Sequence, residues 1–175
     1  MALFDDLVFY NPWWVRKSVP EGLVEEFKRP DLLEVIGLLD SKRIVVIKGA
    51  RRVGKTTLLY QLIDFLFSKD IQPENVLFLS LDDPKVRVGL EEIFQVYEER
   101  VLKKPLGECK QVFVILDEVQ FMKEWELQVK KFFDRKYPIT FIVSGSSSTL
   151  IRRGTESLVG RTIERVISPF SFKEF

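Results

Sequence analysis

Nine consecutive residues combine glycine, lysine and threonine in a pattern that could bind phosphate: Gly49, Ala50, Arg51, Arg52, Val53, Gly54, Lys55, Thr56 and Thr57. Their spacing fits G-x-x-x-x-G-K-[ST], the phosphate-binding loop or Walker A motif. A phosphate chain needs several backbone N–H groups directed at one point, and glycine adopts the required conformations most easily. We expect Lys55 to contact the β- and γ-phosphates and the Thr56 hydroxyl to bind Mg²⁺.

Two acids, Asp117 and Glu118, follow the apolar run 112–116. A buried strand that ends in acids brings carboxylates to the edge of a parallel sheet where ligands bind, although the pair alone also fits a solvated strand end. We expect Asp117 to hold Mg²⁺ opposite Thr56 through a water, and Glu118 to orient the water that attacks the γ-phosphate. This favours hydrolysis over transfer to a small acceptor, and a P-loop kinase remains the weaker alternative.

Strands alternating with helices are expected to position these residues. The apolar run 44–47 predicts a strand before the loop, and residues after Lys55 have helical spacing. Further strands are predicted at 75–81, 111–116, 139–143 and 162–167, and further helices at 32–39, 90–101, 125–133 and 149–157. This alternation predicts an α/β fold with a mostly parallel sheet between two helical layers, and 175 residues suit one compact domain.

The first thirty residues are predicted to form an N-terminal extension, followed by a core over 31–168. Trp13 and Trp14 stand beside Pro12, which disfavours a continuous helix. Such large aromatic side chains are rarely exposed, and two interpretations stay open. They either pack on the domain or contact a partner or an adenine ring.

Composition excludes several classes of site. Lys and Arg number 27 against 26 Asp and Glu, so the net charge of +1 predicts no general attraction to nucleic acid or membrane. Cys109 is the only cysteine and the chain has no histidine, which excludes an internal disulfide, a Ser–His–Asp triad and a histidine zinc site. These features, with no apolar run of membrane-spanning length and no signal-peptide pattern, predict a cytoplasmic protein.

Several motifs together resemble the AAA+ ATPases. They are Gly-Ala-Arg-Arg-Val-Gly-Lys-Thr-Thr-Leu, Leu-Asp-Glu-Val-Gln, Ser-Gly-Ser-Ser-Ser, Val-Gly-Arg-Thr and the closing Ser-Pro-Phe-Ser-Phe-Lys-Glu-Phe at 168–175. They look closest to an archaeal and bacterial branch of ATP-binding proteins related to the STAND ATPases. The resemblance covers about residues 28–175 and implies a P-loop nucleotide-binding core that uses ATP and Mg²⁺, with a five-stranded sheet in the order 5-1-4-3-2.

The resemblance also implies catalytic roles for residues beyond the two main motifs. Ser144 or Ser146 lies where the family places its γ-phosphate sensor, usually an asparagine, so the exact sensor stays open. Arg161 lies where an arginine finger would act on the nucleotide of a neighbouring subunit. The alternative for Arg161 is an ion pair within its own domain.

Two further expectations concern the chain after the second strand. Ser80 could hold Glu118 inactive until a partner binds, while Asp82 or Asp83 could compete for the Mg²⁺ shell. Both come from the resemblance and from the position of these residues at the end of a strand.

Family members continue past the closing signature into a helical lid and further domains. Residues 169–175 are therefore expected to begin a connection to such a lid, and the core alone is expected to bind nucleotide and turn over slowly. The predicted function is Mg²⁺-dependent ATP hydrolysis that drives a conformational change in a larger protein. The alternative is a switch gated by ADP or ATP with little catalysis. A homo-oligomer, and a protein or DNA partner bound through the further domains, stay open, while no membrane contact is expected.

Overall fold

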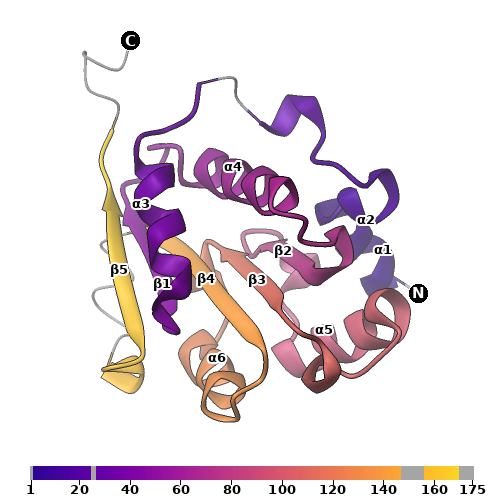
Figure 1. The fold of residues 1–175 in the computed structure, drawn as a ribbon. Helices are drawn as coiled ribbons and strands as arrows, with labels where there is room; N and C mark the ends of the chain where they lie inside the picture. The colour runs from indigo at the N-terminus through magenta and orange to yellow at the C-terminus, as the bar shows by residue number, and fades with distance from the viewer. Residues whose placement is uncertain (1, 25–26, 147–155, 170–175) are drawn as a thin grey trace.

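The computed structural model describes residues 2–24, 27–146 and 156–169 of the chain. Five parallel strands form one sheet in the spatial order β2-β3-β4-β1-β5 (Figure 1). The strands are β1 (Ile44–Gly49), β2 (Val76–Ser80), β3 (Val112–Asp117), β4 (Ile139–Ser146) and β5 (Thr162–Ile167). This order, read from the opposite edge, is 5-1-4-3-2, so the predicted sheet is confirmed.

Helices cover both faces of the sheet and complete the predicted three layers. Figure 1 shows α3 (Asp31–Leu38) and α4 (Lys55–Ser68) on one face, with α5 (Leu90–Tyr97) and α6 (Trp125–Asp134) on the other. Two short helices, α1 (Ala2–Tyr10) and α2 (Trp13–Arg16), lie beside β2. The remaining turns are the 3₁₀ segments Glu21–Leu23, Leu39–Ser41, Pro73–Asn75, Pro84–Val86, Leu106–Glu108, Val119–Phe121 and Glu156–Leu158, and the π-helical segment Glu98–Leu102. Most of the helix predicted at 149–157, and residues 170–175 of the closing signature, fall outside the described residues.

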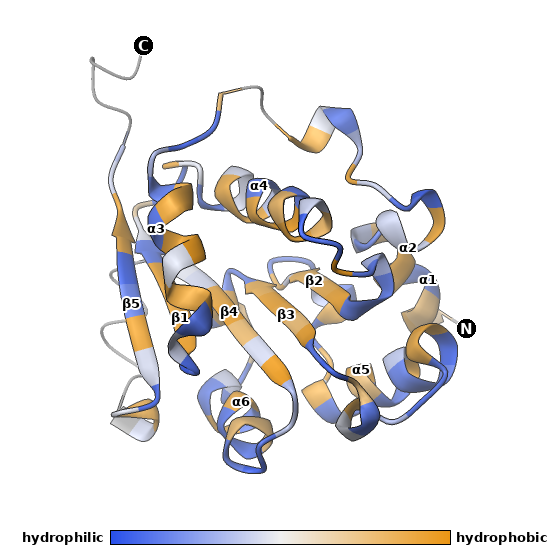
Figure 2. Ribbon diagram, viewed as in Figure 1, coloured by the Kyte–Doolittle hydropathy of each residue, from blue (hydrophilic) through white to orange (hydrophobic). Residues whose placement is uncertain are grey.

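The central strands are apolar because helices cover them on both faces. Every residue of β1 and of β3 is buried, and Figure 2 shows both strands as largely hydrophobic. β5 is an edge strand whose residues are mostly half-buried or exposed, with Ile167 as its buried end. The resulting frame pairs β1 on both sides up to Gly49, where the phosphate-binding loop begins.

The free edge of β2 is closed by a side chain from the N-terminal segment. Asn11 is fully buried, and its amide donates to the Phe78 carbonyl at 2.9 Å while its oxygen accepts from the Phe78 N–H at 2.6 Å. It thereby makes the two hydrogen bonds that a neighbouring strand would make. Trp13 and Trp14 both donate their indole N–H to the Val76 carbonyl, at 3.1 and 3.0 Å. An exposed strand edge is a site for unwanted pairing, so these contacts protect it.

The two tryptophans pack inside the domain. Trp13 makes edge contacts with Phe67 on α4 and with Phe78 on β2, and Trp14 stacks on Tyr97 of α5 with ring centroids 5.4 Å apart. Of the two interpretations left open by the sequence, packing on the domain is the one observed. The predicted N-terminal extension therefore supplies part of the hydrophobic core.

Candidate phosphate-binding site

The loop between β1 and α4 needs glycine at both ends. Gly54 has φ of +87°, and a Cβ there would lie 2.6 Å from Nη1 of Arg29. A Cβ on Gly49 would lie 2.8 Å from Cγ2 of Val53 and 2.9 Å from the carbonyl oxygen of Ile167. A side chain at Gly49 would therefore displace the backbone. A side chain at Gly54 would be strained by the positive φ and would displace the guanidinium group of Arg29. Arg52 also has positive φ, at +64°, so the backbone curves tightly before helix α4 begins at Lys55.

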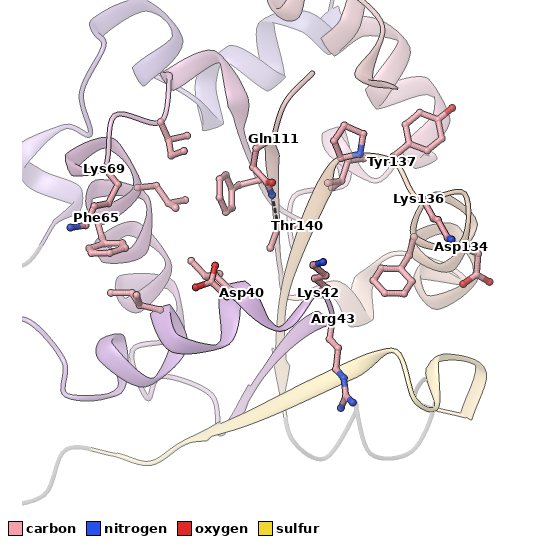
Figure 3. A pocket seen from close by; sticks show the side chains of 18 residues that line it. Asp40, Lys42, Arg43, Phe65, Lys69, Gln111, Asp134, Lys136, Tyr137 and Thr140 are labelled. Carbon is pink, nitrogen blue, oxygen red and sulfur yellow. Dashed lines mark hydrogen bonds between the residues drawn. The ribbon is translucent and has the colours of Figure 1, made fainter. Parts of the chain in front are cut away.

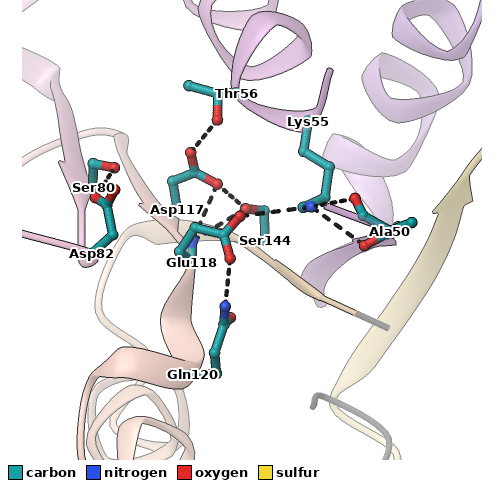
Figure 4. A network of polar contacts seen from close by, with 10 residues as sticks. Ala50, Lys55, Thr56, Ser80, Asp82, Asp117, Glu118, Gln120 and Ser144 are labelled. Carbon is teal, nitrogen blue, oxygen red and sulfur yellow. Dashed lines mark hydrogen bonds and ion pairs between the residues drawn. The ribbon is translucent and has the colours of Figure 1, made fainter. Parts of the chain in front are cut away.

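Lys55 is buried at the start of α4, and its ammonium group faces the loop. Nζ lies 3.0 Å from the carbonyl oxygen of Ala50 and 3.3 Å from that of Gly49. It also lies 3.6 Å from Oε1 of Glu118 (Figure 4). A buried ammonium group needs such partners, and its position at a helix N-terminus adds to the attraction for an anion.

Thr56 and Asp117 bring two side-chain oxygens together from different elements. The Thr56 hydroxyl at the start of α4 donates to Oδ2 of Asp117 at the end of β3, over 2.6 Å (Figure 4). Mg²⁺ prefers hard oxygen ligands, and it usually takes one or two from the protein with the rest from water and phosphate. The donor set therefore fits the magnesium ion that the sequence predicts, which Thr56 would bind directly and Asp117 through a water.

Ser144 on β4 fixes the Asp117 carboxylate from the other side. Its hydroxyl is fully buried, donates to Oδ1 of Asp117 and lies 3.3 Å from the Glu118 N–H, which also donates to Oδ1 at 3.1 Å. Burial raises the pKa of Asp117, while the hydrogen bonds from Ser144 and Thr56 oppose that shift. A carboxylate that is costly to ionise gains most from a cation beside it.

Glu118 has an uncommon backbone conformation. Its φ of +53° is in the left-handed region, which non-glycine residues enter mainly where the surrounding structure imposes it. One carboxylate oxygen faces Lys55, and the other accepts from Nε2 of Gln120 (Figure 4). Sequence reasoning did not assign Gln120 a role, although it is part of the Leu-Asp-Glu-Val-Gln motif. The sequence feature that could have indicated this contact is the position of Gln120 two residues after Glu118. The 3₁₀ turn Val119–Phe121 brings the Gln120 side chain back to the Glu118 carboxylate.

The two serines expected at the sensor position have different surroundings. Ser144 is already engaged with Asp117, whereas Ser146 ends β4 in register with Gly49, where the loop begins. The sensor role stays a prediction for both residues.

Ser80 does not contact Glu118 as the resemblance suggested. Its hydroxyl donates to Oδ1 of Asp82 at 2.7 Å, and Gln120 is the uncharged side chain that holds Glu118. Asp83 accepts from the Tyr10 hydroxyl at 2.9 Å. The contacts of Asp82 and Asp83 therefore lend no support to a competing role in the Mg²⁺ shell.

Arg161 lies where the parallel strands begin, whereas the phosphate-binding loop lies where they end. It precedes β5, and it forms a two-pronged ion pair with Asp134 at the end of α6, over 2.7 and 3.2 Å. This is the within-domain ion pair that the sequence left as the alternative. A role toward the nucleotide of a neighbouring subunit stays a prediction.

A cavity of about 880 Å³ also lies at the end of the sheet where the strands begin (Figure 3). Its lining includes Lys42, Phe65, Phe113 and Tyr137. Because β1, β3 and β4 begin there and the loop follows the other end of β1, this cavity is separate from the candidate site. Within the described ranges, no helix has the length and apolar character needed to cross a membrane.

Comparison with known proteins places the chain in a family. Residues 41–175 match the sequence profile of the AAA domain family AAA_14. An uncharacterized Methanocaldococcus jannaschii protein, MJ1637, is 33% identical over 137 residues, which cover 78% of this chain and 28% of that protein. This chain spans between 28% and 36% of the length of the curated relatives that it matches.

Solved structures with low sequence identity share the fold. The Walker-type ATPase of Pyrococcus abyssi superposes with a TM-score of 0.56 at 17% identity, covering 85% of this chain and 55% of that one. PCH-2 of C. elegans superposes with a TM-score of 0.54 at 17% identity, covering 94% of this chain and 48% of that one. With the profile match over most of its length, the loop and the parallel sheet, the chain belongs to the AAA domain family and is an AAA+ P-loop ATPase core.

Proposed function

We propose that this chain binds ATP with Mg²⁺ and hydrolyses it. The observation that carries the proposal is the convergence of four side chains at one edge of the sheet: Lys55, Thr56, Asp117 and Glu118. They come from the start of α4 and the end of β3, which are distant in sequence. A lysine, a hydroxyl and two carboxylates in this arrangement suit the transfer of a phosphoryl group to water.

Each residue has a separate task in the proposed reaction. The loop N–H groups bind the phosphate chain, and Lys55 contacts its terminal groups. Thr56 and Asp117 would hold Mg²⁺, which supplies positive charge to the oxygens of the transferred group. Glu118 orients the attacking water and accepts its proton, which requires its carboxylate to leave Lys55. Gln120 donates a hydrogen bond to the second oxygen of Glu118 and keeps the side chain in place when the first oxygen leaves Lys55.

Two substitutions test the assignment. Glu118→Gln keeps ATP binding and lowers hydrolysis by about 10² to 10⁴-fold, because it removes the proton acceptor but not the loop. Lys55→Ala loses ATP binding. Calorimetric titration with ATP and ADP, with and without Mg²⁺, and a phosphate-release assay measure both effects. Glu21→Gln, an exposed acid in the N-terminal segment, serves as the control. If both site variants hydrolyse ATP as fast as the parent, the assignment is wrong.

A switch with little catalysis is the second candidate. The observation in its favour is that both carboxylate oxygens of Glu118 already have partners, one in Lys55 and the other in Gln120. On this proposal the nucleotide controls conformation and the chain releases it slowly. Purified protein that retains ADP and releases no phosphate from added ATP supports the switch. Steady phosphate release that Glu118→Gln abolishes supports the enzyme.

The activity of the whole protein is a further proposal. Because this chain spans about a third of its curated relatives, we propose that hydrolysis drives a conformational change in a larger protein. The resemblance suggests assembly into a homo-oligomer, and partners among proteins or DNA through other parts of that protein. A single cysteine, Cys109, buried and without a disulfide, suits the proposed cytoplasmic location.

A further inference from the structure

Arg29 is a charged residue buried beside the phosphate-binding loop. Only 2% of it is exposed, and it belongs to the segment before α3. The profile match to the AAA domain family begins at residue 41, so Arg29 lies outside the matched region. A buried guanidinium group is costly unless its donors find acceptors, and the acceptors it meets here indicate what it does.

The guanidinium group joins the loop to the chain that leaves β5. Nη1 donates to the Val53 carbonyl inside the loop and is the group that a Cβ on Gly54 would meet. Nη2 donates to the Ser168 carbonyl, directly after β5, at 2.9 Å. Nη2 also lies 3.4 Å from Oδ2 of Asp31 at the start of α3. One planar group therefore contacts three segments.

Gln61 fixes the same segment to the helix that follows the loop. Its Oε1 accepts from the Arg29 backbone N–H at 3.1 Å, and its Nε2 donates to the Phe27 carbonyl at 2.6 Å. Gln61 is buried on α4, the helix that begins with Lys55. The position of Arg29 is thus set by the helix that positions the catalytic lysine.

We propose that Arg29 is a positioning residue for the phosphate-binding loop and couples the loop to the chain after β5. The inference rests on the proposed function and adds a regulatory link to the same site. By holding the Val53 carbonyl, Arg29 keeps the loop backbone in one conformation before ATP arrives, and such preorganisation increases affinity. Because the other half of the guanidinium group holds Ser168, a loop that tightens on ATP also restrains the chain leaving β5.

Arginine is required because its fork reaches two carbonyls in a fixed geometry. Lysine keeps the charge but presents a single donor group, so it cannot hold Val53 and Ser168 together. Arg29→Lys therefore separates geometry from charge. Arg29→Ala removes both, and added guanidinium ions can occupy the space that it leaves.

The experiment measures ATP affinity in the 175-residue chain with Arg29→Lys and Arg29→Ala. We expect Arg29→Lys to fold and to bind ATP about tenfold to a hundredfold more weakly, and guanidinium ions to restore part of the binding in Arg29→Ala. Arg165→Ala is the matched control, since Arg165 bonds the same Asp31 at 3.2 Å but from β5. We expect it to bind ATP within about twofold of the parent, as for a half-exposed ion pair.

Hydrogen exchange tests the coupling separately. In the parent, ATP is expected to slow amide exchange both in the loop (49–56) and at residues 166–168, and in Arg29→Lys it is expected to slow exchange in the loop only. The inference is overturned if folded Arg29 variants bind ATP as tightly as the parent, or if Arg165→Ala weakens binding equally. A parent chain that binds no ATP at all would instead refute the proposed function.

Discussion

Asp117 illustrates how one side chain at the site trades stability for binding. It is 1% exposed, and its carboxylate is held by hydroxyl groups from Thr56 and Ser144. Burial raises its pKa, so the folded chain binds a proton there more tightly than the unfolded chain does. Ionised Asp117 therefore lowers stability, and this cost is fully present at pH values above the raised pKa. A bound cation would remove much of it.

Asp117→Asn should stabilise the fold while abolishing Mg²⁺-dependent nucleotide binding. The asparagine keeps an acceptor for Ser144, and the Thr56 hydroxyl can rotate to accept from the new amide. We expect the free energy of unfolding at pH 8 without Mg²⁺ to rise by about 1 kcal/mol, a usual gain when a strained functional residue is replaced. The difference from the parent should shrink as the pH falls through the raised pKa toward that of an unfolded aspartate. Urea melts at several pH values measure this.

Asp134→Asn provides a control of opposite sign. The hydrogen bond from Arg161 lowers the pKa of Asp134, so that carboxylate contributes stability above its unfolded pKa and loses it as the pH falls through the lowered value. Its replacement should lower stability at neutral pH. If Asp117→Asn lowers stability in the same way, burial is not what dominates at Asp117.

The sequence predicted those site residues that belong to a local motif with fixed spacing. Lys55, Thr56, Asp117 and Glu118 come together as the two motifs predict, because strand ends of a parallel sheet meet at one edge. Arg29 was not predictable, since an isolated arginine before a proline carries no pattern. Its burial follows from tertiary contacts with the loop and with Ser168, which is 139 residues away in sequence.

At the scale of elements, closure of the β2 edge depends on Asn11. We expect Asn11→Leu, which keeps a similar volume, to lower the free energy of unfolding by about 2 to 4 kcal/mol. It leaves buried N–H and C=O groups of Phe78 without partners, each costing about 1 to 3 kcal/mol. Chemical denaturation measures the loss, and light scattering measures any self-association at the opened edge. Gln72→Leu, an exposed amide to apolar change, should alter stability by less than about 0.5 kcal/mol.

The elements themselves were largely predictable, and their packing was less so. The strand predicted at 162–167 matches β5, and the β1 and β3 runs are apolar because both faces are covered. β4 extends to Ser146, beyond the predicted 143, since serine and glycine there give no apolar signal. The packing of Trp13 and Trp14 could not be derived from the sequence. Their shared hydrogen-bond acceptor, the Val76 carbonyl, is distant in sequence and comes close only in the tertiary fold.

At the scale of the molecule, we expect slow turnover from the 175-residue chain. Glu118 is engaged by Lys55 and Gln120, so each cycle must first release it. We expect a turnover number below about 1 per second, the low end for enzymes, in a steady-state phosphate-release assay. A rate comparable to the fastest P-loop ATPases from monomeric chain would contradict this prediction.

Mixing variants tests whether Arg161 acts between subunits. Arg161→Ala chains keep a complete loop, whereas Lys55→Ala chains keep Arg161. If Arg161 supplies a finger in assembled protein, the mixture should hydrolyse ATP faster than the sum of the two, since a finger accelerates hydrolysis by about 10³ to 10⁵-fold. Asp134→Ala, which frees Arg161 from its ion pair, should retain activity. A mixture that shows no gain would leave Arg161 with the structural ion pair only.

The Asn11 contact also limits how copies of the chain can associate through their sheets. A sheet extends by adding strands at an open border, and side chains of the same polypeptide already occupy the hydrogen-bonding groups of Phe78 and Val76 on one border. Within the described part of the chain, β5 pairs with β1 alone, so addition is directed to the other border of β5. Two copies joined there would bury the open border of both and leave none for a third, so strand pairing between copies ends at a pair instead of continuing into a fibre.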